Sequence, residues 1–187
     1  MRIPRRRPRA VARTASRGVV LVFTGNGKGK TTAALGVALR ALGQGIRVAV
    51  VQFLKGGWPS GETKALRRFG NRIAIHSEGD PFTWESRDRA REEASVLRAF
   101  RRAKGYLADG RHGLVVLDEA NVAMAYGLLP VRTLVVAIRS RPAGVHVILT
   151  GRNAPRAILR LADLVTEMKA VKHPFDKGIA AAKGLDF

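Results

Sequence analysis

The 187-residue sequence contains no cysteine. This absence excludes disulfide bonds, thiolate metal sites and a cysteine nucleophile. The sequence also has no run of roughly 18 or more apolar residues, so we expect no membrane-spanning helix. Its N-terminus is rich in arginine and proline and lacks the apolar stretch of a secretion signal, which predicts a cytoplasmic protein.

Acidic residues are also scarce. The chain has 14 Asp and Glu against 34 Lys and Arg, and its first acidic residue is Glu62. Removing the seven arginines of residues 1–17 lowers the formal net charge from +20 to +13. We expect residues 1–17 to form a flexible basic arm and residues 18–187 to form one domain.

The positive charge fits two interpretations. It could bind nucleic acid through phosphate contacts, or it could serve a site that holds a highly charged triphosphate. Only 6% of the residues are aromatic, and most of them lie away from the basic runs. Because aromatic stacking usually accompanies single-strand binding, we regard nucleic acid as an unlikely partner.

Short apolar runs alternate with helical patterns from Gly18 onward. The apolar runs predict strands over residues 19–23, 46–53, 72–75, 114–117, 145–149 and 164–168. The helical patterns cover residues 31–42, 87–107, 131–140 and 155–161. Strands separated by helices indicate βαβ units. Together with the glycine- and lysine-rich loop at residues 24–32, they predict an α/β, three-layer P-loop NTPase-like fold, with a mostly parallel central sheet flanked by helices.

A phosphate-binding loop follows the first predicted strand and opens the first predicted helix. In such a loop backbone amides surround an anion, a lysine adds positive charge and a hydroxyl binds Mg²⁺. Lys30 is the expected phosphate lysine and Thr31 the expected metal-binding hydroxyl. The usual first glycine of the pattern is replaced by Thr24. The predicted ATP-binding residues are Gly25, Asn26, Gly27, Lys28, Gly29, Lys30, Thr31 and Thr32.

Two acidic residues, Asp118 and Glu119, end the predicted strand at 114–117. Carboxylates at the end of a buried strand beside the phosphate-loop strand would face the metal, directly or through water. Together with Thr31 they are the candidate metal ligands.

The sequence offers no obvious protein nucleophile outside the loop. Its four histidines are scattered without metal spacing: His76, His112, His146 and His173. We expect His146 to be structural and His112 to lie in a loop, whereas the sequence leaves open whether His173, just before Pro174, reaches a site. Phe82 and Trp84 stand in a polar loop before the long helix, where they could form an aromatic platform or anchor that helix.

The chain resembles the corrinoid adenosyltransferases of the cobalamin pathway. The phosphate loop within residues 23–34 carries the first match. The others follow in order over roughly residues 18–187: Gln52-Phe-Leu-Lys-Gly56, Trp58-Pro-Ser-Gly-Glu62, Phe82-Thr-Trp-Glu85, Leu117-Asp-Glu119, Leu149-Thr-Gly-Arg-Asn153, Ala162-Asp-Leu-Val-Thr-Glu-Met168, Lys172-His-Pro-Phe-Asp-Lys-Gly178 and Lys183-Gly-Leu-Asp-Phe187. The chain departs from the family at Glu78-Gly-Asp-Pro81, where Pro81 stiffens the approach to Phe82.

This resemblance implies a reaction. Such enzymes transfer the 5′-deoxyadenosyl group of ATP to the Co(I) centre of a corrinoid and release triphosphate, so the cobalt itself is the nucleophile. The corrinoid would be cob(I)yrinic acid a,c-diamide or cobalamin, in biosynthesis or in salvage. The resemblance implies a catalytic role for Lys30, Phe82 and Trp84, with the two aromatics packing beneath the corrin ring. Thr31 and Glu119 would bind Mg²⁺ or Mn²⁺, with Asp118 close behind.

The resemblance also implies partners. An electron-donating reductase or flavoprotein would reduce Co(II), and the protein would be a homodimer. In the family the N-terminal arm can cover a partner's site, and whether the arginines of this chain do so stays open.

Two other functions remain open on the residues alone. A nucleic-acid-dependent ATPase would use the loop and the positive charge, with Arg152 as a candidate arginine finger. A small-molecule kinase would need a second acceptor site with a base, which the sequence does not reveal.

Overall fold

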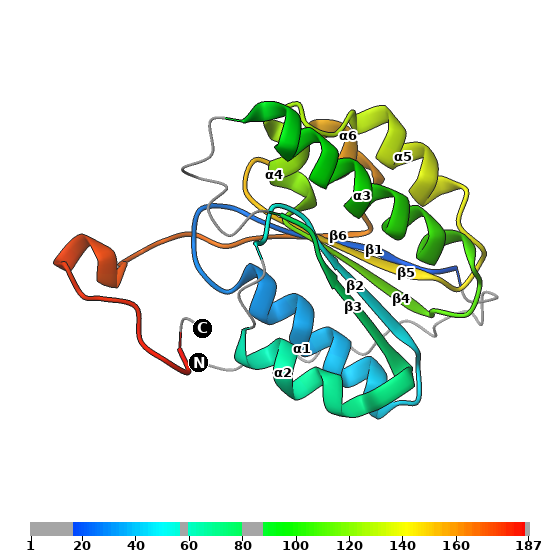
Figure 1. The fold of residues 1–187 in the computed structure, drawn as a ribbon, viewed down its shortest axis with the longest axis horizontal. Coiled ribbons are helices and arrows are strands. Elements are labelled where there is room, and N and C mark those ends of the chain that lie inside the picture. The colour runs from blue at the N-terminus through cyan, green and yellow to red at the C-terminus, as the bar shows by residue number, and fades with distance from the viewer. Residues whose placement is uncertain (1–16, 57–59, 80–87, 186–187) are drawn as a thin grey trace, which may run out of the picture.

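A computed structural model describes residues 17–56, 60–79 and 88–185 of the chain. Its centre is a six-stranded sheet in the order β3-β2-β4-β5-β1-β6, and every neighbouring pair is parallel. The predicted parallel sheet is therefore confirmed (Figure 1). The strands are β1 Val20–Thr24, β2 Val48–Gln52, β3 Ile73–Ser77, β4 Leu114–Asp118, β5 His146–Thr150 and β6 Leu164–Glu167.

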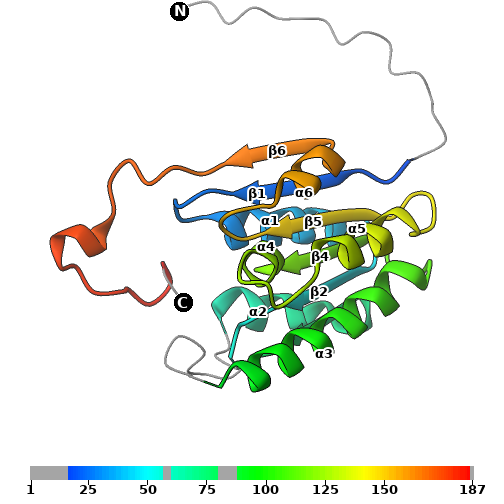
Figure 2. The same ribbon diagram turned by 90° about the horizontal axis from the view of Figure 1, so that it is seen from above.

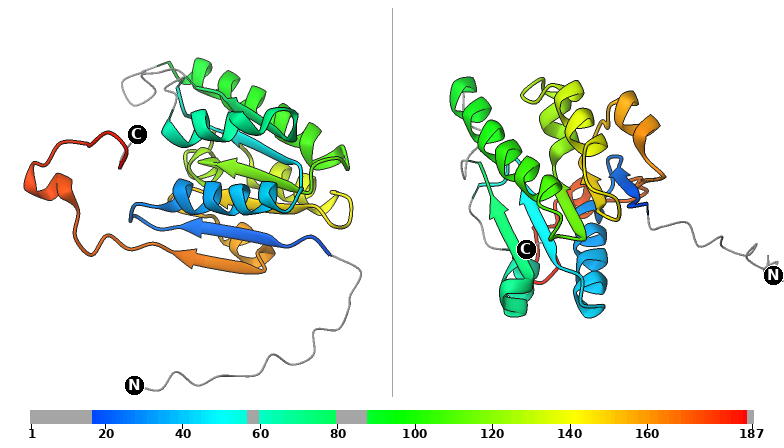
Figure 3. Two further views of the ribbon diagram at one scale, coloured as in Figure 1. Left: turned by 90° about the horizontal axis from the view of Figure 1, so that it is seen from below. Right: turned by 90° about the vertical axis from the view of Figure 1, so that its right-hand side faces the viewer.

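Helices cover both faces of this sheet, as a parallel sheet built from βαβ units requires. On one face lie α1 Lys30–Gly43 and α2 Gly61–Leu66, followed by the 3-10 helix η1 Arg67–Arg72. On the other face lie α3 Arg89–Ala108, α4 Ala120–Ala125, α5 Val131–Arg139 and α6 Arg156–Leu161 (Figures 1 and 3). The predicted three-layer α/β fold is thus confirmed.

The two central strands explain why the sequence reads as continuous apolar runs there. All five residues of β2 and all five of β4 are buried, because helices pack on both of their faces. Val50 and Val116 face α1, whereas Val51 and Leu117 face the layer that contains α3 and α5. Alternate residues of one strand therefore serve two separate cores.

The observed boundaries differ from the predicted ones by a few residues. β2 is shorter than the run at 46–53, and β3 begins at Ile73 and extends to Ser77. Two helices, α2 and α4, were not predicted from the sequence. Each has six residues, so a helical period is weak there, although the equally short α6 was predicted.

The edge strand β6 leads into a C-terminal segment that includes the short 3-10 helix η2 Pro174–Lys177. This segment extends away from the sheet and then turns back (Figure 2). The turn brings Leu185 beside the cavity described below. No helix in the described part of the chain is long and apolar enough to cross a membrane.

Candidate active site

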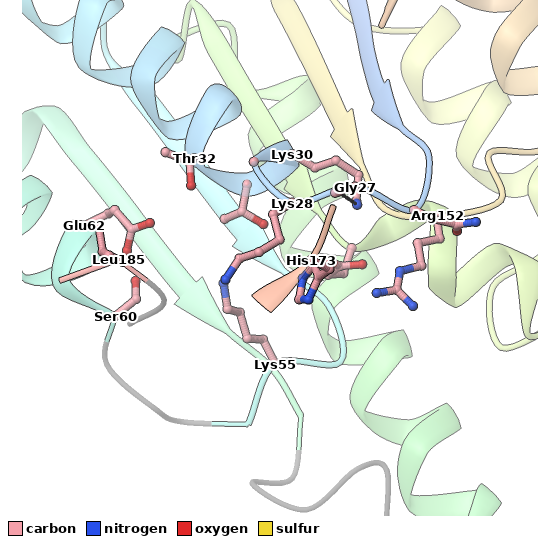
Figure 4. A pocket seen from close by; sticks show the side chains of 14 residues that line it. Gly27, Lys28, Lys30, Thr32, Lys55, Ser60, Glu62, Arg152, His173 and Leu185 are labelled. Atoms are coloured by element: carbon pink, nitrogen blue, oxygen red, sulfur yellow. Dashed lines mark hydrogen bonds between the residues drawn. The ribbon is translucent and has the colours of Figure 1, made fainter. Parts of the chain in front are cut away.

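A cavity of about 370 Å³ opens at the carboxyl ends of the strands, where an α/β sheet binds its ligands. The phosphate loop forms one wall. Figure 4 shows Arg152 on one side of the cavity and Glu62 with Ser60 on the opposite side. The lining residues are Asn26, Gly27, Lys28, Gly29, Lys30, Thr31, Thr32, Lys55, Ser60, Glu62, Glu119, Arg152, His173 and Leu185.

The phosphate loop is braced by the end of the neighbouring edge strand. The Gly27 amide donates to the Met168 carbonyl at 2.7 Å. Gly25 has a φ of 93°, and a Cβ there would lie 2.4 Å from the Met168 oxygen. Only glycine fits this position, because both its conformation and the close backbone exclude a side chain. The glycine that follows Thr24 therefore supplies the tight turn.

Lys30 begins α1 and is almost fully buried, with 8% of its surface exposed. Its ammonium donates to the carbonyls of Gly25 at 2.8 Å and Gly27 at 2.7 Å. Burial lowers the pKa of Lys30 below its usual value, and the nearby Glu119 carboxylate partly opposes that shift. The loop thus holds its lysine by two carbonyl oxygens at the cavity wall.

A row of polar side chains joins the ends of four adjacent strands. Ser77 donates to the Gln52 Oε1 atom at 2.7 Å, and the Gln52 amide donates to Asp118 Oδ2 at 3.0 Å. The hydroxyls of Thr150 and Thr31 donate to Asp118 Oδ1 at 2.6 and 2.8 Å. Because the Thr31 hydroxyl donates its hydrogen bond to Asp118, the lone pairs of the hydroxyl oxygen are available to a metal ion.

Asp118 and Glu119 differ in their environments. Asp118 is completely buried, whereas Glu119 lines the cavity. Glu119 has a φ of 60°, and its amide donates to the Thr150 hydroxyl at 2.9 Å. Burial, followed by repulsion from Asp118, raises the pKa of the Glu119 carboxyl. A strained backbone thus presents a destabilised carboxylate to the cavity, as functional sites often do.

Comparison with known proteins decides the family. A model described as ATP:corrinoid adenosyltransferase BtuR/CobO/CobP matches residues 16–187. The chain belongs to this family.

Relatives within the corrinoid adenosyltransferases are similar over most of their length. The corrinoid adenosyltransferase of Pseudomonas aeruginosa is 48% identical over 171 residues, which cover 91% of this chain and 84% of that protein. Corrinoid adenosyltransferase CobA of Salmonella typhimurium is 46% identical over 171 residues, with 91% and 86% covered. A corrinoid adenosyltransferase of a Sinorhizobium species is 42% identical over 177 residues, with 94% and 83% covered. The resemblance inferred from the motifs is confirmed.

The structure brings most of the predicted site residues together. Seven of the eight predicted ATP-binding residues line the cavity, and Gly25 contributes its carbonyl to Lys30. Glu119 lies in the cavity wall, and Asp118 is bonded directly to Thr31. The two predicted corrinoid-binding residues, Phe82 and Trp84, lie outside the described residues.

Several cavity residues carried no independent signal in the sequence. Four residues approach the loop from other parts of the chain: Lys55, Ser60, Glu62 and Leu185. Only the family motifs that contain them had marked these segments in the sequence. His173 lines the cavity, a position that the sequence had left open.

The other histidines make structural contacts away from the cavity. His76 bonds to the Tyr106 hydroxyl at 2.6 Å, and the His112 ring bonds to Asp109 at 2.6 Å. His146 accepts a hydrogen bond from the Val19 amide at 3.2 Å. The predicted structural role of His146 and the loop position of His112 are in agreement with these contacts.

Gly151 leaves the space that the Glu119 carboxylate occupies. It has a φ of 121°, and a Cβ there would lie 3.1 Å from Glu119 Oε2 and 3.0 Å from the Val122 amide. We expect Gly151→Ala to displace Glu119 and to lower the free energy of unfolding by about 1–3 kcal/mol. The kcat/KM for ATP should fall as well, and urea unfolding with steady-state kinetics measures both.

Gly36→Ala is the matched control. Gly36 lies inside α1, and a Cβ at this position has no neighbour within 4 Å. This substitution should stabilise the helix by about 0.5–1 kcal/mol and leave kcat/KM unchanged. Equal effects of the two substitutions would contradict the role given to Gly151.

Proposed function

We propose that this protein transfers the 5′-deoxyadenosyl group of ATP to the cobalt of a reduced corrinoid and releases inorganic triphosphate. The observation that carries the proposal is the cradle formed by Lys30, Thr31, Asp118 and Glu119 in a chain of the ATP:corrinoid adenosyltransferase family. The substrate is a corrinoid such as cob(I)yrinic acid a,c-diamide or cobalamin, and the reaction serves biosynthesis or salvage of the adenosylated form.

The chemical step needs little from protein side chains. The electron pair of Co(I) attacks C5′, a cobalt–carbon bond forms and the C5′–O bond breaks. Triphosphate leaves with the bonding pair, and the cobalt is formally oxidised from Co(I) to Co(III). The protein must hold C5′ against the cobalt and stabilise the growing charge on the leaving group. Lys30 and the loop amides are placed for that second task.

The donor set also fits a divalent metal bound together with the nucleotide. Among the described residues no group of three His, Cys, Asp or Glu side chains gathers to hold a metal alone. Mg²⁺ commonly uses one or two protein ligands together with phosphate oxygens and water, and Mn²⁺ accepts similar oxygen ligands. Thr31 and Glu119 would provide the protein ligands, while Asp118 orients Thr31. The metal would neutralise charge on the triphosphate.

The corrinoid would bind through Phe82 and Trp84. This assignment rests on the match of Phe82-Thr-Trp84 to the family pattern, since both residues lie outside the described part of the chain. An apolar platform beneath the corrin ring would displace the lower axial ligand of Co(II) and ease its reduction.

The reaction also implies partners. Conversion of Co(II) to Co(I) needs one electron, and we propose that a reductase or flavoprotein supplies it. We propose that the protein is a homodimer. The cytoplasmic location stays a prediction from the sequence.

Product analysis tests the proposed function. Protein, ATP, Mg²⁺ and a chemically reduced corrinoid should yield inorganic triphosphate and an adenosylated corrinoid in equal amounts. ADP with phosphate would indicate an ATPase, and ADP with a phosphorylated metabolite would indicate a kinase. Either result in place of triphosphate would overturn the proposal. Family membership already disfavours the nucleic-acid-dependent ATPase.

A further inference from the structure

Lys55 enters the cavity from the opposite side to the phosphate loop. It follows β2, lines the cavity and has a side chain that is 32% exposed (Figure 4). Its ammonium lies 3.4 Å from Asp118 Oδ2. This contact is longer than the other three bonds to Asp118, which measure 2.6, 2.8 and 3.0 Å.

Asp118 does not depend on Lys55 for its hydrogen bonds. Oδ2 also accepts from the Gln52 amide, and Gln52 is oriented by the Ser77 hydroxyl on its other end. Because Ser77 occupies the Gln52 oxygen, the amide nitrogen faces Asp118. The Lys55 ammonium can therefore leave Asp118 without stranding a buried carboxylate.

The backbone of Lys55, in contrast, is firmly placed. Its amide donates to the Glu78 carbonyl at 3.2 Å, and the preceding Leu54 has a φ of 52°. The backbone of Gly79 packs so closely that a Cβ there would lie 2.7 Å from the Lys55 nitrogen. The strained backbone at Leu54 and the hydrogen bond to Glu78 thus fix the backbone of Lys55, and the long flexible side chain of Lys55 extends from it toward the cavity.

We propose that Lys55 is a second phosphate-binding cation. On nucleotide binding its ammonium moves from Asp118 to a triphosphate oxygen and, as the C5′–O bond breaks, it stabilises the leaving group from the side opposite Lys30. This inference rests on the proposed function and adds a residue to it. Lys30 is anchored by two loop carbonyls, whereas the ionic contact of Lys55 with Asp118, within the described residues, is long at 3.4 Å.

A purely structural role would have different consequences. If Lys55 only neutralised Asp118, its loss would lower the stability of the protein, and phosphate affinity would fall only as far as the fold was disturbed. If Lys55 binds phosphate, affinity for inorganic triphosphate should fall while the unfolding midpoint changes little.

Calorimetric titration of inorganic triphosphate with Mg²⁺ into the full-length protein separates these roles. Lys55→Met should weaken triphosphate binding by roughly ten- to a hundredfold, as expected for a lost charged hydrogen bond. Lys55→Arg should recover most of that affinity, because it restores the charge and the donors. Lys64→Met, on the exposed side of α2, is the matched control and should bind as the wild type does.

Two outcomes overturn the proposal: unchanged triphosphate affinity in Lys55→Met, or a loss that arginine does not rescue and that a lower urea midpoint accompanies. The binding measurement does not depend on turnover. Wild-type protein that makes ADP instead of triphosphate would refute the proposed function, whereas a Lys55→Met variant with normal triphosphate affinity would refute only the role of Lys55.

Discussion

Lys30→Met is expected to lower kcat/KM for ATP by roughly a hundred- to a thousandfold, the usual cost of removing one preorganised donor to a developing anion. Lys30 is the most buried cation of the cavity wall, and its hydrogen bonds to Gly25 and Gly27 set its position. Removing the ammonium takes away charge where the triphosphate would accumulate it. It also leaves two loop carbonyls without their donor, so the loop should become less ordered.

Steady-state kinetics with reduced corrinoid and triphosphate detection measures this effect, and urea unfolding shows whether the fold is intact. Lys104→Met on the exposed surface of α3 is the control and should behave as the wild type. A Lys30→Met variant that raises KM for ATP but keeps the wild-type kcat would contradict the leaving-group role, because that pattern marks equal binding of ground state and transition state.

The fold followed from the sequence because its strongest signals are local. The apolar run of β4 and the alanine-rich sequence of α1 are each recognisable from a few consecutive residues. Both elements lie close to their predicted bounds. The phosphate loop was equally easy to recognise, because its glycines, Lys30 and Thr31 are close together in the chain. A six-residue helix such as α4 shows only a weak helical period in its sequence, although α6, of the same length, was predicted.

The site was predictable only where its residues are contiguous. Asp118 and Glu119 stand out at the end of an apolar run, but the donors to Asp118 come from other strands. The register that places Gln52 opposite Asp118 is set by the packing of the whole sheet, and no local pattern contains it. The contact of Met168, just after the end of β6, with Gly27 of the loop joins residues more than a hundred positions apart, so no local pattern contains it either.

Glu119→Gln is expected to abolish most of the activity and yet to stabilise the protein at neutral pH. Glutamine keeps the shape of the side chain but removes the charge that would bind the metal. We expect kcat/KM for ATP to fall by roughly a hundredfold or more, in the range found for lost electrostatic stabilisation. Steady-state kinetics over a range of Mg²⁺ concentrations measures this loss, and the variant should need a higher Mg²⁺ concentration for half-maximal activity, because Thr31 and the phosphate oxygens remain as ligands.

The gain in stability follows from the pKa of Glu119, which burial and the adjacent Asp118 raise above its ordinary value of 4.5. The folded protein therefore holds this proton more tightly than the unfolded chain does. The contribution of Glu119 to stability is greatest below pH 4.5 and is lost as pH rises through the raised folded pKa. Above that pKa the wild type carries a buried charge that the glutamine variant lacks.

Urea unfolding of both proteins at about pH 5 and about pH 8 should thus show the stability advantage of Glu119→Gln growing with pH. Glu93→Gln on the exposed face of α3 is the control and should stay within about 0.5 kcal/mol of the wild type at both pH values. A Glu119→Gln variant that is less stable at pH 8 would mean that the carboxylate holds the fold together, and that it is not a strained ligand kept for the metal.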